Sequence, residues 1–126
     1  MFPLDIGIWE RFLETHAKDY KGVDYDVKVG QGTQPPENTP PNYARMQDIL
    51  SKYRIDVVGY KGSLIEIIEV KPEASTVAIG QVVTYVELYK RDFKPTLPVR
   101  GVIITDHFVP DIDYLTKLLG FDYHIV

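Results

Sequence analysis

Two apolar runs joined by a short turn place the strongest constraint on the fold of this 126-residue chain. Residues 55–60 (IDVVGY) and 64–71 (LIEIIEVK) are rich in β-branched side chains, and Lys61-Gly62 separates them. A turn of this kind between two such runs predicts a β-hairpin. Pro72 would end the second strand, because proline cannot donate a hydrogen bond to a sheet.

The hairpin also predicts where its charged side chains point. If Lys61-Gly62 is a two-residue loop, Asp56 lies opposite Ile67. Side chains alternate along a strand, so Asp56, Glu69 and Lys71 then project from one face. Asp56 and Glu69 would be diagonal neighbours, roughly 7–8 Å apart, which is close enough to share one metal ion. A three-residue loop would instead place them on opposite faces.

The rest of the chain alternates between helical and extended patterns. Asp5 is the expected N-cap of the first helix, and Gly120 the expected C-terminal stop of the last. Helical spacing predicts helices over residues 4–18, 76–91 and 111–119, and β-rich runs predict further strands over 25–29, 99–105 and 121–126. The order is helix, strand, hairpin, helix, strand, helix and short strand. It predicts an α/β (α+β) fold, a mixed sheet with helices on both faces.

Four prolines fall within residues 33–42 (TQPPENTPPN). Such a density excludes an interior helix or strand, so we expect a stiff surface loop or a loop that borders a substrate cleft. A short helix is expected to follow over residues 43–53. The total length fits one domain over residues 1–126, because two halves would each lack a sufficient core.

Composition narrows the class of protein. Hydrophobic residues make up 44% and charged residues 25%, which is typical of a folded globular domain. The absence of cysteine excludes disulfides, thiolate zinc sites and cysteine nucleophiles. No apolar run approaches the ~20 residues of a membrane helix, and the N-terminus lacks the basic start of a signal peptide. We therefore expect a cytoplasmic protein. The net charge of −4 argues against binding nucleic acid by bulk charge, but it leaves a local basic groove open.

Asp56 and Glu69 form the strongest candidate site. Two carboxylates on one spot repel each other unless a cation lies between them. Oxygen ligands favour Mg²⁺ or Mn²⁺, and the Val70 carbonyl oxygen offers a further ligand. Such a metal would polarise a phosphodiester and activate a bound water, which Lys71 would orient. The alternative is a surface ion pair at a strand end, although charges within apolar runs are costly unless paired or functional.

Other titratable residues give weaker signals. Glu66 and Glu73 have no lysine two residues further on, and we expect both on the solvated surface. His16, His107 and His124 match no metal-ligand spacing, and surface or edge positions are expected for them.

Three short motifs in order resemble the PD-(D/E)XK nuclease superfamily. They are Arg54-Ile55-Asp56, then Ile68-Glu69-Val70-Lys71, then Gln81-x-x-x-Tyr85 on the following helix. The last motif resembles that of the RecB-like branch, and in a helix its two residues lie one turn apart on one face. The resemblance covers roughly residues 8–105. The sequence departs from the family pattern in having no proline directly before Asp56.

The resemblance implies a restriction-endonuclease-like core in which Asp56 and Glu69 bind the metal. It further implies that Lys71 assists the attacking water and that Gln81 and Tyr85 line the site near DNA.

In this superfamily, a glutamate of the first helix is often a further metal ligand. Glu10 is the best match in this chain, and Glu14 is its rival.

These observations predict a Mg²⁺- or Mn²⁺-dependent deoxyribonuclease, with either single- or double-stranded DNA as substrate. The alternative is a catalytically inactive nuclease-fold module that binds nucleic acid or a protein partner. An enzyme of this size that cuts both strands of a duplex would be a symmetric homodimer. Compact single-domain members of the superfamily are typical of phage and mobile-element genes, and the resemblance extends that expectation to this chain.

Overall fold

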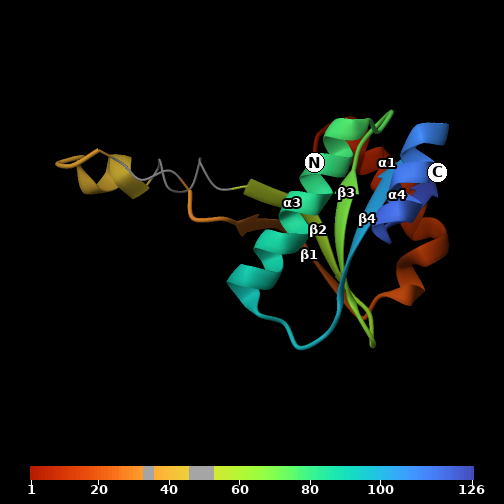
Figure 1. Ribbon diagram of the computed structural model, residues 1–126, viewed down its shortest axis with the longest axis horizontal. Coiled ribbons are helices and arrows are strands. Elements are labelled where there is room, and N and C mark those ends of the chain that lie inside the picture. Colours follow the sequence, from red (N-terminus) through yellow and green to blue (C-terminus); the bar gives the residue numbers. More distant parts are fainter. Residues whose placement is uncertain (33–35, 46–52) are drawn as a thin grey trace.

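A computed structural model describes residues 1–32, 36–45 and 53–126 of the chain (Figure 1). Helix α1 is followed by a short 3-10 helix, η1, and three strands; from α3 on, helices and strands alternate. In chain order they are α1 (Pro3–His16), η1 (Ala17–Asp19), β1 (Gly22–Val29), β2 (Tyr53–Tyr60), β3 (Ile65–Val70), α3 (Thr76–Phe93), β4 (Val99–Thr105), α4 (Pro110–Leu119) and β5 (Asp122–Ile125). No helix among them is long and apolar enough to cross a membrane.

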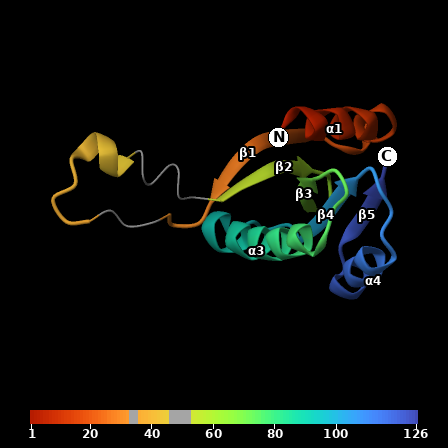
Figure 2. The ribbon, with the colours of Figure 1, turned by 90° about the horizontal axis from the view of Figure 1, so that it is seen from above.

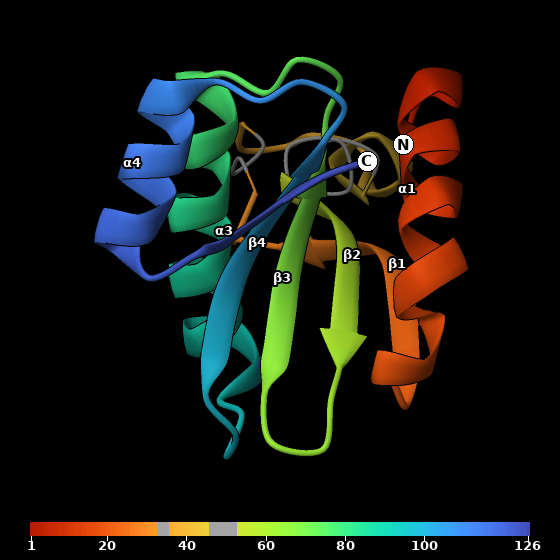
Figure 3. The same ribbon diagram turned by 90° about the vertical axis from the view of Figure 1, so that its right-hand side faces the viewer.

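The strands form one mixed sheet in the order β1-β2-β3-β4-β5. β1, β2 and β3 are antiparallel neighbours, whereas β3, β4 and β5 run parallel. Helix α1 covers one face, and α3 and α4 cover the other (Figures 2 and 3). The predicted mixed sheet with helices on both faces is therefore confirmed.

Each face of the sheet has its own core. On one face, α1 contributes Ile8, Trp9 and Phe12, which pack with Val57 and Ile68 of the central strands. The opposite core lies between the sheet and α3, whose buried residues include Ile79, Val82, Tyr85, Val86 and Tyr89. Residues 65 and 67 of β3 belong to this second core, whereas 68 and 70 belong to the first. Alternation therefore directs Glu69 towards α3.

The start of α1 differs from the prediction. The N-cap is Phe2, and Asp5 is the third residue of the helix. Its Oδ2 accepts a hydrogen bond of 2.9 Å from the backbone nitrogen of Phe2. This is the half of a capping box in which the third helical side chain reaches back to the cap. Asp5 thus caps the start of α1 by accepting a hydrogen bond from the N-cap residue, and its side chain is buried.

The hairpin register differs from the prediction by two residues, because Tyr60 pairs with Ile65 and not with Ser63. Tyr60 pairs with Ile65 and Val57 with Ile68, so the connection is residues 61–64 and not a two-residue loop. The paired register ends at Val57 and Ile68. Ile55 and Val57 pack in opposite cores, so the alternation of β2 is interrupted at Asp56 and the loop length alone does not set the face of its side chain. The two carboxyl groups are nevertheless close, because the charge of Asp56 and a side-chain hydrogen bond with it both raise the pKa of Glu69.

The proline-rich segment is only partly described. Residues 33–35 lie outside the described residues, and residues 36–40 form a turn. The helix begins at Pro41, earlier than predicted, which proline tolerates because the first helical N–H has no partner within the helix. Residues 41–45 are helical, Tyr53 belongs to β2, and the intervening part of the predicted helix lies outside the described residues.

Candidate active site

Asp56 and Glu69 meet at the carboxyl end of β3. The amino-terminal ends of α1 and α3 lie at the same end of the sheet (Figure 3). Glu69 is only 7% exposed. The Oδ2 atom of Asp56 accepts a hydrogen bond of 3.0 Å from the backbone nitrogen of Val70. This bond holds the Asp56 carboxylate against the end of β3, close to Glu69.

Burial raises the pKa of both carboxyl groups, and the charge of Asp56 raises that of Glu69 further. Burial and then repulsion from Asp56 raise the pKa of Glu69 to about 8, and Lys71 acts in the opposite direction. The pKa of Asp56 is also raised, chiefly by burial, although the Val70 N–H opposes the shift. At neutral pH the pair therefore retains a proton that two solvated carboxylates would have lost.

The α1 carboxylate that reaches this pair is Asp5, not Glu10 or Glu14. Both glutamates are exposed, whereas Asp5 is 6% exposed and its charge raises the pKa of both Asp56 and Glu69. The prediction of Glu10 as a further ligand is thus corrected by the geometry. The sequence could have indicated that Asp5 is buried. It lies three, four and seven residues before Ile8, Trp9 and Phe12, on the apolar stripe of the helix.

Lys71 directly follows β3 and is exposed. Its backbone nitrogen donates a 3.0 Å hydrogen bond to the Ile104 carbonyl, so pairing with β4 continues one residue past the strand. Alternation then puts Lys71 on the same face as Glu69, as predicted. Its positive charge lowers the pKa of both Asp56 and Glu69, so the ammonium lies within electrostatic range of the pair.

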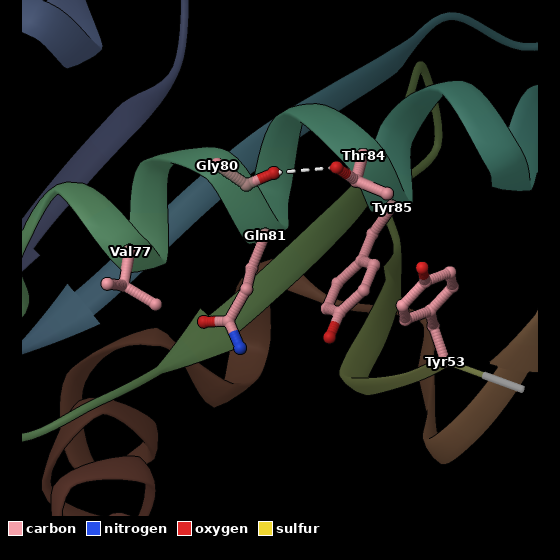
Figure 4. A pocket seen from close by; sticks show the side chains of 6 residues that line it. All are labelled: Tyr53, Val77, Gly80, Gln81, Thr84 and Tyr85. Carbon is pink, nitrogen blue, oxygen red and sulfur yellow. Dashed lines mark hydrogen bonds between the residues drawn. The ribbon is translucent and has the colours of Figure 1, made fainter. Parts of the chain in front are cut away.

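Gln81 and Tyr85 project from one side of α3 (Figure 4). Tyr85 is 8% exposed, and its pKa is raised by burial first and then by Glu69 and Asp56. The Tyr85 hydroxyl is therefore close enough to the carboxylates to sense their charge. Tyr85 thus lies within electrostatic range of the hairpin pair, and Gln81 lies one helical turn before it.

A cavity of about 420 Å³ opens next to these residues (Figure 4). It is lined by Tyr53, Val77, Gly80, Gln81, Thr84 and Tyr85. The Tyr53 and Tyr85 rings have centroids 6.1 Å apart and are inclined at 45°. From the sequence, Tyr53 lies at the end of an expected helix and could stack on a base if exposed. The structure places it in this wall, 53% exposed.

The donor set available to a metal is small. Within residues 1–32, 36–45 and 53–126, no group of three or more His, Cys, Asp or Glu side chains is arranged to hold a metal ion. Asp56 and Glu69 supply carboxylate oxygens, and the Val70 carbonyl remains the backbone oxygen between Glu69 and Lys71. Hard oxygen donors of this kind suit Mg²⁺ or Mn²⁺ with water in the remaining positions.

Glu66 occupies a second, separate buried acid site, contrary to its predicted surface position. It is 1% exposed and accepts hydrogen bonds from the Tyr20 hydroxyl at 2.5 Å and from Arg100 at 2.7 Å. Lys61 lies 3.2 Å from the same carboxylate. Burial acts to raise the pKa of Glu66, but these donors outweigh it and the pKa is lowered. This acid is fully paired, so its role is structural.

The remaining rivals lie away from the pair. Glu73 and His107 are exposed, as predicted. His16 and His124 are far apart in the sequence, yet their ring centroids are 5.1 Å apart beside Phe12. Burial is the main reason that the pKa of His124 is lowered.

No family model and no curated protein matches this sequence. Two solved structures are similar in fold. The first is the structure of an EndoMS–dsDNA2 complex, with a TM-score of 0.55 and 14% identity, covering 96% of this chain and 44% of that one. The second is a repair endonuclease from Pyrococcus abyssi, with a TM-score of 0.52 and 13% identity, covering 96% of this chain and 46% of that one. The chain spans less than half the length of either, and its mixed five-stranded sheet with flanking helices is a fold that both endonuclease structures contain.

Proposed function

We propose that this chain is a metal-dependent nuclease that hydrolyses phosphodiester bonds in DNA, with the site chemistry of the PD-(D/E)XK superfamily and its RecB-like branch. The adjacent carboxyl groups of half-buried Asp56 and buried Glu69, with Lys71 beside them, are the observation that carries the proposal. Two carboxylates with raised pKa values cost stability unless a cation joins them. The fold likeness to two endonucleases supports the same function.

The residues present fit a divalent cation. Asp56 and Glu69 would hold it, the Val70 carbonyl would add an oxygen, and Asp5 would contribute further negative charge from α1. When bound, Mg²⁺ or Mn²⁺ would supply Lewis-acid activation of the phosphodiester and of water. Its positive charge would also replace the proton that the pair retains, which is the electrostatic reason for expecting affinity at this spot.

The chain's own residues would position the substrate and the nucleophile. The Lys71 ammonium would orient the attacking water and stabilise negative charge that develops on the phosphate. Tyr85, whose hydroxyl senses both carboxylates, would hydrogen bond to the DNA backbone next to them. Because the net charge is −4, phosphate contacts would be confined to this end of the sheet.

An inactive nuclease-fold module that binds nucleic acid or a protein partner is the second candidate. One observation favours it: the described residues contain no arrangement of three acidic or histidine side chains for a metal. Metal binding separates the two candidates, because only the nuclease requires it. Calorimetric titration with Mn²⁺ should therefore show binding that is lost in Asp56→Ala.

Cleavage assays test the proposal directly. Plasmid, linear duplex, single-stranded and branched DNA would be incubated with Mg²⁺ or Mn²⁺, and with EDTA as the metal-free control. Lys71→Ala should reduce cleavage by about 10²-fold or more while leaving the fold intact, because the side chain is exposed. Lys18→Ala, an exposed lysine on η1, is the matched control and should retain activity.

Cleavage that is equally fast in wild type, Lys71→Ala and Asp56→Ala would overturn the assignment of this site. Cleavage of both strands of a duplex would also predict a homodimer, which analytical ultracentrifugation with and without DNA would detect.

A further inference from the structure

The cavity on α3 lies beside the carboxylate pair, not on it. Its walls are the helix positions Val77, Gly80, Gln81 and Tyr85, with Tyr53 of β2 opposite (Figure 4). Tyr85 connects the two places. Its ring lines the cavity, and its hydroxyl lies within range of the charges of Asp56 and Glu69. A group in the cavity would therefore be about one tyrosine side chain away from a phosphate held at the carboxylates.

The cavity contains a polar atom with no partner. Gln81 Oε1 is buried and accepts no hydrogen bond within the described residues. The neighbouring Thr84 hydroxyl is already committed, because it donates to the Gly80 carbonyl at 2.8 Å. A buried acceptor without a donor costs free energy, so a ligand that brings an N–H to Gln81 would be favoured.

The aromatic wall favours a flat ligand. Tyr53 is 53% exposed, so its ring is accessible to another ring, and the Tyr85 ring centroid lies 6.1 Å from its own at 45°. A planar ring with N–H groups on its edge would stack on Tyr53 and donate to Gln81. Nucleobases combine both properties, and every base has a face that stacks on tyrosine.

We propose that this cavity receives the unstacked base of a nucleotide next to the scissile phosphate, so that the preferred substrate is DNA that is single-stranded or locally unpaired. This inference rests on the proposed nuclease function and specifies its substrate. A fully paired base lies inside the helical stack, and it would have to be everted before it could enter. The acidic net charge strengthens the argument, because weak bulk attraction to phosphates leaves stacking as a main source of affinity.

Gly80 offers a way to close the cavity without disturbing the fold. A Cβ atom added at Gly80 would meet nothing within 4 Å. The Gly80 carbonyl, which accepts from Thr84, is unaffected by a side chain. Gly80→Leu should therefore fill the space where the base would lie, whereas Gly80→Ala should leave most of it open. This pair separates loss of the cavity from any general effect of a side chain on α3.

The test uses a duplex that carries one unpaired 2-aminopurine, a base whose fluorescence falls when it stacks. Binding would be followed with Ca²⁺ in place of Mg²⁺. Wild type should quench the fluorescence and bind this duplex more tightly than one with an abasic nucleotide at the same place. Tyr53→Ala and Gly80→Leu should lose the quenching and bind about 5- to 100-fold more weakly. Gly80→Ala, which adds only one methyl group to the cavity, should weaken quenching and binding less than Gly80→Leu does. Tyr114→Ala, which changes an exposed tyrosine on α4 away from the cavity, should behave as wild type.

The outcomes separate this inference from the proposed function. If wild type cleaves DNA but neither Tyr53→Ala nor Gly80→Leu changes its preference between unpaired and fully paired duplexes, the base site is overturned and the nuclease remains. If wild type cleaves nothing with any metal while the quenching still depends on Tyr53, the nuclease is overturned and the base site is supported. Thermal unfolding of each variant would confirm that it is folded, and Tyr53→Ala decides the question should Gly80→Leu not fold.

Discussion

Replacing Glu69 by glutamine should stabilise the protein at neutral pH. Most changes to a buried polar residue destabilise, so the expected sign is unusual. Folding carries Glu69 from its ordinary pKa of 4.5 to about 8, because burial and Asp56 disfavour its charge. At pH 7 the folded protein must therefore bind a proton that the unfolded chain does not hold. Glutamine is neutral in both states and avoids this cost.

The magnitude follows from the pKa difference. A raised folded pKa gives stability that is complete below the unfolded value and is lost as the pH rises towards the folded value. Each pH unit in this window costs about 1.4 kcal/mol, so wild type loses about 3 kcal/mol between pH 4.5 and pH 7. For a chain of 126 residues this corresponds to a Tm higher by roughly 10 °C in Glu69→Gln at pH 7.

Thermal and urea unfolding of wild type and Glu69→Gln would be measured at intervals from pH 4 to pH 8 without divalent metal. The two proteins should have similar stability at pH 4, and the advantage of Glu69→Gln should grow with pH. Mn²⁺ should stabilise wild type more than the variant, because the charged pair binds it better. Glu73→Gln, an exposed glutamate on the loop after β3, is the control and should change little.

A variant that is less stable than wild type at pH 7 would refute the reasoning, as would a difference that does not change with pH. Either result would mean that the Asp56–Glu69 pair is not held together against repulsion in the free protein.

Three further substitutions test the fold around the site. Glu66→Gln should reduce the free energy of unfolding by about 3 kcal/mol at pH 7, because it leaves Arg100 without its buried carboxylate. The pKa of Glu66 is lowered, so this loss should shrink as the pH falls and the wild-type carboxylate is protonated as well. Urea unfolding at pH 7 and pH 3 would show the difference. Gly101→Ala should cost about 1–3 kcal/mol, because its Cβ would lie 2.8 Å from the Phe121 ring, and a Tm equal to that of wild type would contradict this packing. Gly80→Ala should instead gain about 0.5–1 kcal/mol in thermal melts, because its Cβ meets open space on α3.

The sheet could be predicted well because its signals are local. The strand over 99–105 and the stop at Gly120, with its φ of 73°, follow from an apolar run and a helix-ending glycine. The hairpin loop was harder, because Lys61-Gly62 fits a two-residue turn and nothing nearby marks the longer connection of residues 61–64. The closeness of Asp56 and Glu69 comes from the end of β2, where alternation is interrupted, and not from the loop length.

The helix contribution to the site was mispredicted for a different reason. Asp5 fits two local patterns at once. It lies near the start of a helix, and it lies on the apolar stripe of α1. The first pattern suggested a cap, and the motif resemblance then directed attention to Glu10 and Glu14 further along. Only the packing of α1 on the sheet shows that Glu10 points to solvent and that Asp5 lies within electrostatic range of Asp56. Tertiary docking of a helix decides which of its acids is buried, and no short motif contains that information.

Strand β3 carries two buried acids three residues apart, and their environments distinguish structure from function. Glu66 faces α1 with hydrogen bonds from Tyr20 and Arg100, and its pKa is lowered. Glu69 faces α3 beside Asp56, and its pKa is raised. The surroundings of Glu66 stabilise its ionised form, whereas the surroundings of Glu69 disfavour its ionised form. A fold retains such a cost where a ligand removes it, so a perturbed acid beside another acid marks a functional site more strongly than burial alone. The same strand thus supplies its own internal control for the proposed metal site. Diamagnetic Mg²⁺ should shift the titration of Glu69 and leave that of Glu66 unchanged, as carbon-13 NMR of the two carboxyl groups would show.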